Sequence, residues 1–394
     1  MRTARIFFAI LCTAATLVAI GCDRGEPTTP STAPPSDVEM IDAGAEPKVM
    51  VKLQFVPGRY RQLERLRTTM ETDMPDLGEL LPSSLPASLP VSLPADLQLP
   101  PDFELPPELR SMSLPASLPA GFRLTLPSTM PTSMTTKIDG VFTSDLVVGA
   151  PNADGEVALT LTVRRVEMTM ALPLLANPMT VDTDKPADAQ SVPHELVTLF
   201  EGLCGRTLTA RYDRHGRALE VTGNDAIIKY LHQSNPMYAK QLIPYFGDEA
   251  TRRRMLAACK QMIPNRSVGL GAKWKGLIRH ELPDAGSIES PIVCTLLEIG
   301  RENDRPIVRV GYTGKPTYGK RTKFPTPTGV PVQIDRFEAD LSGDYVLDAD
   351  TGMFVRQTID LTAEMEAKMP IAAMGKPITT KTTMHLVIEV APVD

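Results

Sequence analysis

The stretch FEADLSGDYVLDADTGMFVRQTIDLTAEM, from Phe337 to Met365, decides the fold. Apolar and polar residues alternate along it with a period of two, which is typical of β-strands that have one face in water. Asp348 to Gly352 interrupts the alternation with turn-forming residues, so the stretch predicts two long antiparallel strands. The apolar face of the pair carries Phe337, Ala339, Leu341, Tyr345, Leu347, Met353, Val355, Ile359, Leu361 and Met365.

The same alternation recurs on both sides of this hairpin. Before it, we expect early strands within residues 48–55, 59–73 and 134–148. The later strands are expected at Lys273–Leu282, Ile292–Gly300, Ile307–Thr313, Gln333–Leu347, Met353–Met365 and Ile378–Val390. Long antiparallel strands in one sheet twist and curl, so these segments predict a large curved sheet.

A change of phase in one strand predicts a β-bulge. Val157 to Val163 place their apolar residues on one face, whereas Val166 to Leu172 follow in the opposite phase. One extra residue at Arg164-Arg165 would return both sets to the same face.

Helical spacing is confined to the middle of the chain. Asn224 can cap a helix that contains Ile227, Ile228 and Leu231, and Asp248 begins a stronger helix that ends near Ile263. We therefore expect an α+β fold: a half-barrel-like antiparallel sheet with a helical cluster, from about Asn224 to Ile263, packed on its concave face.

The order of turns in the second half of the chain resembles a known family. Tyr212-Asp213-Arg214-His215-Gly216 and Leu219 to Gly223 precede a helical segment, Lys273-Trp274, Gly343-Asp344 and Asp348 to Gly352. This order is similar to a family of uncharacterised bacterial secreted lipoproteins known as a domain of unknown function. The resemblance covers Lys48 to Val390 without the Leu/Pro-rich insertion, and it implies no activity. The expected half-barrel is analogous to lipoprotein carriers at the level of the fold alone.

The N-terminus predicts a lipid anchor. Arg2 and Arg5 precede the apolar run Ile6 to Ile20, which is shorter than the roughly 20 residues of a membrane-spanning helix. Leu17 to Cys22 (LVAIGC) resembles a bacterial lipobox, and an ordinary secretory signal is the alternative. We expect lipidation of Cys22, which would hold the protein at a membrane of the bacterial cell envelope, outside the cytoplasm, in a leaflet that the sequence does not define.

The composition divides the chain into five segments. Residues 1–21 form the signal peptide, and 22–47 hold the lipidated cysteine and a Pro-rich tether. Residues 48–74 supply the first strands, 75–131 form a low-complexity insertion, and 132–394 complete the domain. In the insertion leucine recurs every four residues from Leu81 to Leu97, mostly followed by proline, which favours an extended polyproline conformation over a helix.

No motif predicts an enzyme, a cofactor or a metal site. The sequence has no GxSxG, Walker, GxGxxG or HExxH pattern, and the acidic residues Asp182, Asp184 and Asp188 lack the ordered oxygens of a calcium loop. Cys204, Cys259 and Cys294 read as small buried side chains, with one disulfide among them as the alternative. The histidines are expected to be surface or capping residues; they are His194, His215, His232, His280 and His385.

These observations favour a binding protein. A net charge of −6 and 5% aromatic residues argue against nucleic acid as a partner. We expect a non-catalytic envelope lipoprotein that binds an apolar ligand, either lipid or a lipidated peptide, between the sheet and its helices. The alternative is a structural or interaction lipoprotein with a solid core, whose Leu/Pro-rich arm contacts an unidentified protein partner. A hydrolase would need a histidine beside a nucleophile.

Overall fold

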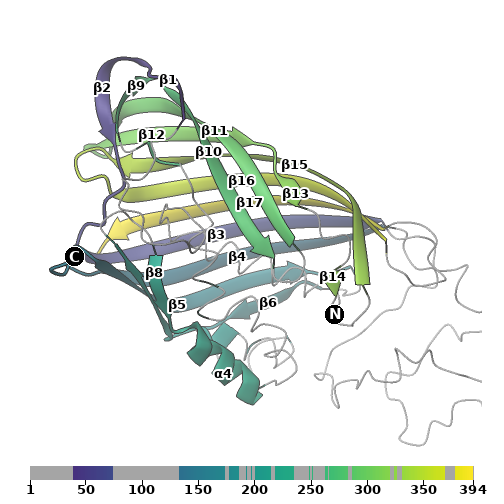
Figure 1. Ribbon diagram of the computed structural model, residues 1–394. Helices are drawn as coiled ribbons and strands as arrows, with labels where there is room; N and C mark the ends of the chain where they lie inside the picture. Colours follow the sequence, from purple (N-terminus) through teal and green to yellow (C-terminus); the bar gives the residue numbers. More distant parts are fainter. Residues whose placement is uncertain are drawn as a thin grey trace, which may run out of the picture.

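The computed structural model describes residues 39–73, 133–173, 177–185, 192, 197, 200–213, 218–234, 248, 251, 262–264, 266–282, 286–319, 324–325, 331–368 and 378–393. Of these residues, 72% are in strands and 6% are in helix. The large curved antiparallel sheet is confirmed, and the α+β class is wrong (Figure 1).

The expected helical cluster is the error. α4 (Asn224–Ser234) is the one helix whose bounds both fall within the described residues, and it lies beyond the end of the sheet order instead of on the concave face. Asp248 and Thr251 are also helical, which agrees with the helix start predicted at Asp248. Most of the stretch 235–261 lies outside the described residues. Met262 and Ile263, which were expected to close a helical face, belong to a short non-helical segment that is buried against the sheet. Their apolar spacing reflects burial and not a helical period.

Twelve strands follow one another across the main sheet in the order β1-β10-β11-β12-β15-β16-β17-β3-β4-β5-β7-β8. The strands of the N-terminal half are β1 (Met40–Asp42), β3 (Gly58–Asp73), β4 (Ser133–Val148), β5 (Val157–Ala171), β7 (Thr207–Tyr212) and β8 (Ala218–Thr222). Those of the C-terminal half are β10 (Lys273–Leu282), β11 (Gly286–Glu302), β12 (Arg305–Gly314), β15 (Pro331–Asp348), β16 (Phe354–Lys368) and β17 (Ile378–Pro392).

Short strands extend this sheet at its margins. β6 (Met179–Asp182) pairs with β5, β13 (Thr317–Gly319) with β11, and β14 (Phe324–Pro325) with β15. A second small sheet consists of β2 (Ala45–Val51) and β9 (Arg266–Leu270). β2 ends at Val51, so the strand that the alternation predicted as far as residue 55 is shorter in the structure.

Two meanders meet at the centre of the sheet. β3 to β8 form one run of antiparallel neighbours, and β10 to β17 form the other. The junction is the antiparallel pair β17–β3, in which Leu386 lies opposite Leu66. In Figure 1, the yellow strand β17 therefore lies beside the purple strand β3, although they come from opposite ends of the chain. The curl brings β10 and β11 in front of the central strands in this view.

The predicted hairpin and the predicted bulge are both confirmed. β15 and β16 pair from Gln333 to Leu347, and the Asp348 carboxylate accepts hydrogen bonds from the Asp350 and Thr351 amides at 3.1 and 2.8 Å. In β5, Arg165 lies opposite Thr143 and Val163 lies opposite Ser144, so Arg164 is the extra residue.

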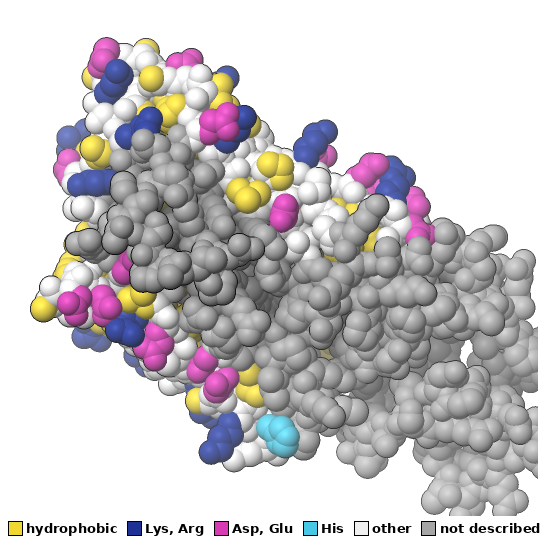
Figure 2. Space-filling view, viewed as in Figure 1, with side chains coloured by type: hydrophobic (Ala, Val, Ile, Leu, Met, Phe, Trp, Pro, Cys, Tyr) yellow, Lys and Arg dark blue, Asp and Glu magenta, His cyan; other side chains and the backbone are white. Residues whose placement is uncertain are grey.

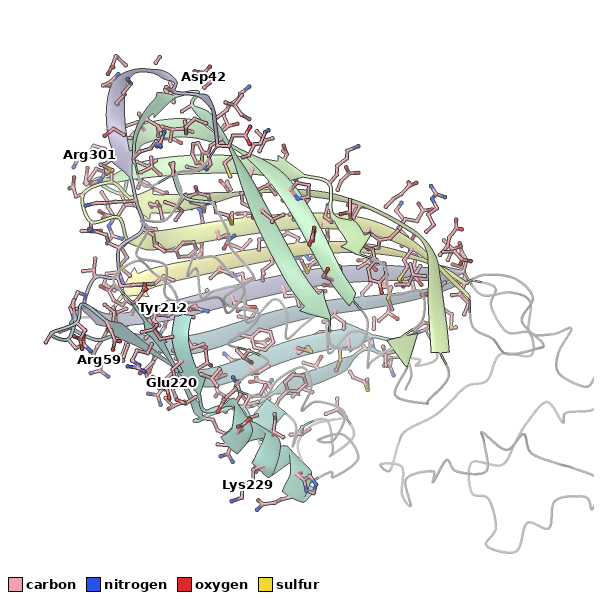
Figure 3. All side chains as sticks on the ribbon, viewed as in Figure 1. Asp42, Arg59, Tyr212, Glu220, Lys229 and Arg301 are labelled. Atoms are coloured by element: carbon pink, nitrogen blue, oxygen red, sulfur yellow. The ribbon has the colours of Figure 1, made fainter. Side chains whose placement is uncertain are left out.

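The convex face is polar and its charges alternate in sign. Arg65 pairs with Glu389 at 2.6 Å, Arg67 with Asp139 at 2.9 Å, and Arg164 with Asp145 at 2.6 Å. In the view of Figure 2, lysine and arginine side chains lie among aspartate and glutamate side chains over the described surface. Figure 3 places Arg59, Arg301 and Lys229 at the periphery of the molecule. Such exposed pairs keep the face soluble and contribute little stability.

Helix α4 begins where the sequence predicts a cap. The Asp248 carboxylate accepts hydrogen bonds from the backbone amides of Asn224 and Asp225 at 2.7 and 3.4 Å, and Asp225 accepts one from the Asp248 amide at 3.1 Å. These bonds satisfy amide groups that have no partner inside the helix. Ile227 and Ile228 are buried, as the spacing predicted. No helix in the described ranges is both long and apolar enough to cross a bilayer.

The N-terminal predictions fall on segments outside the described residues. These include the signal peptide, Cys22, most of the tether and the whole Leu/Pro-rich insertion at 75–131. The division into five segments and the lipid anchor therefore remain predictions.

Candidate functional site

A continuous apolar row crosses the concave face of the sheet. Strand pairing places Cys294, Tyr312, Gly343, Ile359, Leu386, Leu66, Gly140 and Met168 side by side in register. Leu386 and Met168 are 0% and 1% exposed. Alternation along each strand directs these positions to one face because successive side chains point to opposite sides. We name this set the apolar row.

Methionine is frequent on this face. Its thioether side chain is unbranched and flexible, so it fills irregular spaces and adapts to varied partners. The buried methionines of this core are Met70, Met168, Met170, Met179, Met262 and Met384.

At one glycine of the apolar row, Gly140, the neighbouring residues leave room for a Cβ atom. A Cβ atom built on Gly140 would lie 3.4 Å from the ring of Phe142 and 3.6 Å from the methyl group of Met168, which are ordinary contacts. By contrast, a Cβ on Gly343 would lie 2.1 Å from the carbonyl oxygen of Thr358. Glycine within a strand often marks close approach by a ligand or by another backbone.

A second row, two residues along the strands, contains polar side chains. Its register is Leu296, Val310, Tyr345, Gln357, Ile388, Glu64, Phe142 and Val166. Gln62 lies two residues before Glu64 on the same face of β3, and it lies opposite Ser144 of β4. We name Gln62, Glu64, Ser144 and Gln357 the polar belt. These four residues are only 2–4% exposed.

Three oxygens of the polar belt have no hydrogen-bond partner in the described structure: Gln62 Oε1, Glu64 Oε1 and Gln357 Oε1. The amide nitrogen of Gln357 donates to the Tyr312 hydroxyl at 3.4 Å, and that hydroxyl donates to the Thr358 carbonyl at 2.9 Å. A buried polar group without a partner costs about 1–3 kcal/mol. The belt therefore lowers the stability of the sheet as it stands.

Burial alone changes the ionisation of Glu64. Removal of water from the carboxyl group disfavours its charged form and raises the pKa of Glu64 to about 7. The neighbours across the strands are Ile388 and Phe142, which supply no charge that would reverse the shift. The polar belt therefore holds a carboxyl group that is partly protonated near neutral pH.

A short segment covers one side of the concave face. The Met262 carbonyl accepts hydrogen bonds from the Trp274 indole at 2.9 Å and from the Tyr345 hydroxyl at 2.7 Å. These donors come from β10 and β15, so one carbonyl joins two distant strands. Met262 and Ile263 are 3% and 5% exposed, and they pack in the same core as the apolar row.

A small cavity adjoins the polar belt. It has a volume of about 50 Å³, and Val390, which lies opposite Gln62, forms part of its wall. The other lining residues are Leu53, Gln54, Phe55, Val56, Leu146, Val148, Leu159, Met353 and Phe354. This space is large enough for one or two water molecules or a small chemical group, but not for a lipid chain.

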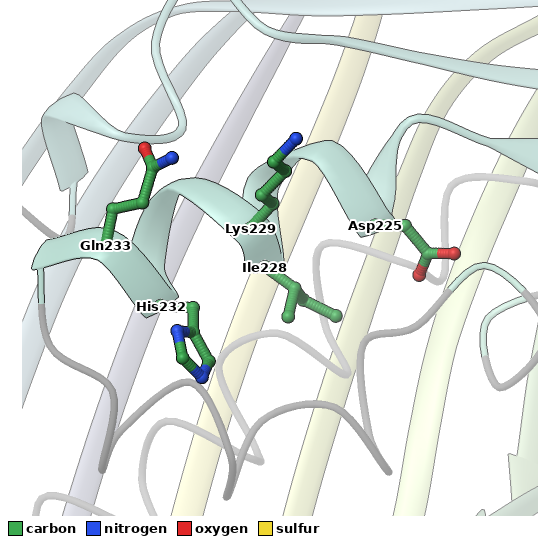
Figure 4. A pocket seen from close by; sticks show the side chains of 5 residues that line it. All are labelled: Asp225, Ile228, Lys229, His232 and Gln233. Carbon is green, nitrogen blue, oxygen red and sulfur yellow. The ribbon is translucent and has the colours of Figure 1, made fainter.

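A larger hollow of about 490 Å³ lies against helix α4. The described residues that line it are Asp225, Ile228, Lys229, His232 and Gln233, which all come from successive turns of this one helix (Figure 4). The hollow is open and its described lining comes from this one helix, so it differs from the enclosed cavity expected of a lipid-binding protein.

The predicted chemical residues are mostly dispersed. His385 forms an exposed pair with Asp360 at 2.7 Å, and His232 lies exposed on α4. His194, His215 and Asp188 lie outside the described residues, as does the His280 side chain. In the described part of the chain, no three His, Cys, Asp or Glu side chains form a group that could hold a metal ion.

Asp182 is held by cations of the protein itself. Arg165 donates two hydrogen bonds of 3.0 Å to its carboxylate, and this contact, opposed by burial, lowers the pKa of Asp182 to about 2. Lys185 lies 3.3 Å from the same carboxylate, and Asp184 lies 3.2 Å from Arg165. These acidic residues thus belong to an ion-pair network at the end of β6.

Two of the three cysteines are described, and both are thiols. Cys294 is buried in the apolar row, and the Cys204 thiol donates to the Thr183 hydroxyl at 3.3 Å. Burial raises the pKa of Cys204, which disfavours the reactive thiolate. Cys259 lies outside the described residues.

The polar belt is the feature that the sequence interpretation missed. In the strand predicted within residues 59–73, Tyr60, Leu66 and Met70 share one face, and Gln62 and Glu64 lie on that same face. The strand period therefore contained the signal, but polar residues in that phase are easily assigned to a wet face.

Comparison with known proteins gives a family and a weak likeness to a solved structure. Residues 154–354 match the model described as "Family of unknown function (DUF6263)". No curated protein is significantly similar to the chain in sequence. A solved structure entitled "Lipid-protein interactions in lipovitellin" aligns with 86% of this chain at 8% identity and a TM-score of 0.38. The aligned region spans 26% of the lipovitellin chain.

Proposed function

This chain belongs to the family of unknown function DUF6263, and we propose from its own geometry that it is a non-catalytic protein that binds an apolar ligand. The ligand would lie on the concave face of the sheet, along the apolar row. Lipid or a lipidated peptide has the chemistry that such a surface accepts. Anchoring through Cys22 would hold this surface beside a membrane of the cell envelope.

The observation that carries the proposal is the composition of the concave face. Apolar residues cross eight neighbouring strands in one register, and flexible methionines surround them. At Gly140 the row carries no side chain, and a Cβ atom there would meet Phe142 and Met168 at ordinary contact distances. An adaptable apolar surface on a curved sheet suits a chain-like ligand better than a reacting substrate, which needs convergent polar groups.

Native mass spectrometry of the full chain, extracted from its membrane in mild detergent, tests the binding. We expect a second mass species with a bound lipid or lipopeptide. Gly140→Leu, which adds a side chain to the apolar row, should reduce that species several-fold. Lys137→Leu adds the same side chain to the exposed face of β4 and should not. Detection of the unliganded mass alone in the parent chain would refute the proposal.

A structural role is the second candidate, and the cover of the concave face favours it. Trp274 and Tyr345 both bond the Met262 carbonyl, so that part of the core is closed by the protein itself. A solid core throughout would leave no space for a ligand. The same experiment separates the candidates because a structural protein would lack the second mass species.

Lipidation of Cys22 has its own test. Metabolic labelling with an alkyne analogue of palmitate should label the parent chain, and Cys22→Ala should remove the label. Labelling that persists in Cys22→Ala, or that is absent from the parent chain, would contradict the anchor.

A further inference from the structure

The polar belt adjoins two apolar clusters on the concave face. The core that contains Leu66 and Leu386 reaches the belt and includes Ile388 between Glu64 and Gln357, and a smaller cluster with Tyr60, Val148, Val157 and Val390 lies beyond Gln62. Nothing in strand geometry demands polar residues between them, because Gln62, Glu64 and Leu66 share one face of a single strand. The belt therefore concentrates polar side chains within a mainly apolar surface.

The unpartnered atoms of the belt have one chemistry. All three are oxygens: the amide oxygens of Gln62 and Gln357 accept hydrogen bonds, and the Glu64 oxygen accepts them when its carboxyl group is ionised. Their residues are 2%, 3% and 3% exposed, so bulk water does not satisfy them. Buried polar groups in folded proteins generally have partners, and an exception needs an explanation. Because the unpartnered atoms are acceptors, a bound molecule that donates hydrogen bonds would explain them.

The three acceptors come from two strands, β3 and β16, that are separated by β17 and share one face of the sheet. Gln62 and Glu64 are two residues apart on β3, a spacing of about 7 Å in a strand. Gln357 is two strands from Glu64, with Ile388 of β17 between them, which places it about 10 Å away across the sheet. The described space beside these residues is the cavity of about 50 Å³, whose wall includes Val390 opposite Gln62, so a small head group would enter the belt from there.

We propose that Gln62, Glu64 and Gln357 form a recognition site for the polar end of the apolar ligand, which is a group that donates hydrogen bonds, such as an amine or a hydroxyl. This inference rests on the proposed function, because it assigns the orientation and the head-group chemistry of the same ligand. The hydrocarbon part would lie on the apolar row, and its donors would replace the partners that the belt lacks. The proposal involves binding alone and no covalent step.

Displacement of a neutral fluorescent probe tests the head-group preference. N-phenyl-1-naphthylamine is bound to the full chain and displaced with dodecylamine, 1-dodecanol or methyl dodecanoate, which differ in the donors at one end. We expect the amine and the alcohol to displace the probe at concentrations at least tenfold lower than the ester does. A stronger effect of the amine would identify a cationic head, and equal effects of amine and alcohol would identify a neutral donor.

Variants of the belt test the residue assignment. Glu64→Met and Gln357→Met keep the approximate length of the side chain and remove the acceptors, so the preference should fall to within threefold. Thr68→Val removes another buried oxygen without a partner from the same face of β3, but outside the belt, and should keep the preference. Glu71→Met makes the matched change on the exposed face of β3 and should also keep the preference.

The outcomes distinguish this inference from the proposed function. Equal displacement by all three compounds, or a preference that survives in Glu64→Met and Gln357→Met, would overturn the recognition site while apolar binding stands. Failure of every compound and of the probe to bind would overturn both. Circular dichroism of each variant separates a lost preference from a lost fold.

Discussion

The apolar row and the polar belt cross the same strands, only two residues apart, but differ in how fully they are satisfied. In the apolar row, Leu66 and Leu386 face each other and are 3% and 0% exposed. In the next row, Glu64 faces Ile388 at 3% exposure and one of its oxygens has no described partner. Equal burial therefore stabilises the first row and strains the second. The comparison shows that equal burial does not mean equal satisfaction of the buried groups.

The largest effect should come from the apolar row. Leu386→Ala removes a fully buried side chain and leaves a cavity, and we expect it to lower the free energy of unfolding by about 3–5 kcal/mol. Urea unfolding measures the change. Leu297→Ala, at a leucine that is 53% exposed, should change stability by less than about 0.5 kcal/mol. Similar losses in the two variants would remove the basis of the comparison.

The free energy of unfolding should depend on pH because of the buried Glu64 carboxyl group of the polar belt. The pKa of Glu64 is about 7 in the folded protein, raised from 4.5 by burial, so the folded state binds more protons than the unfolded state between these values. Its contribution to stability is then present below pH 4.5 and is lost as the pH rises through 7. The loss corresponds to about 3 kcal/mol at 1.36 kcal/mol per pKa unit.

Glu64→Gln isolates this contribution. Unfolding free energies of the parent chain and the variant, measured from pH 4.5 to 8, should diverge as the pH rises, with the parent losing stability relative to the variant. Glu71→Gln is the control on the exposed face and should follow the parent curve. Parallel curves for parent and Glu64→Gln would show that the carboxyl group reaches water.

A satisfied polar group in the same row should behave in the opposite way. The Tyr345 hydroxyl donates to the Met262 carbonyl at 2.7 Å. Tyr345→Phe keeps the ring and removes this bond, so it should destabilise the protein by about 1 kcal/mol. Trp274, the single tryptophan of the chain, also donates to the Met262 carbonyl, so its fluorescence should change in Tyr345→Phe. An unchanged stability would show that the segment does not need this bond.

The smallest effect is expected on the convex face. Arg65 and Glu389 pair at 2.6 Å with half-exposed side chains, directly outside the polar belt. A double-mutant cycle with Arg65→Ala and Glu389→Ala should give a coupling energy of about 0.5 kcal/mol that declines with added salt. A coupling of several kcal/mol would mean that the outer face contributes to the strand junction.

Strand positions could be predicted from the sequence because a period of two is a local property. Lys273–Leu282 was predicted with the bounds of β10, and the slip at Arg164 located the bulge. The pairing of β17 with β3 could not be predicted, since it depends on contacts between residues more than 300 positions apart. Met262 and Ile263 misled the prediction because buried residues near a loop can imitate one turn of a helix.

The candidate site was less predictable than the fold. Gln62 and Glu64 alternate in step with the buried residues of β3, but the sequence alone does not show which face of a strand is covered. Gln357 enters the belt through pairing across β17, which no local pattern specifies. The missing hydrogen bonds can be recognised only when all neighbours are placed.

The central pairing of β17 with β3 has a consequence for biosynthesis. Arg65 and Glu389 are 324 residues apart, so the ladder that unites the two meanders cannot form until nearly the whole described chain has emerged from the ribosome. Until then β3 and β16 each present a long unpaired edge, which is prone to intermolecular association. Contacts of such high contact order also close slowly. Newly made chains should therefore depend on a holding chaperone during the interval before the last strand arrives.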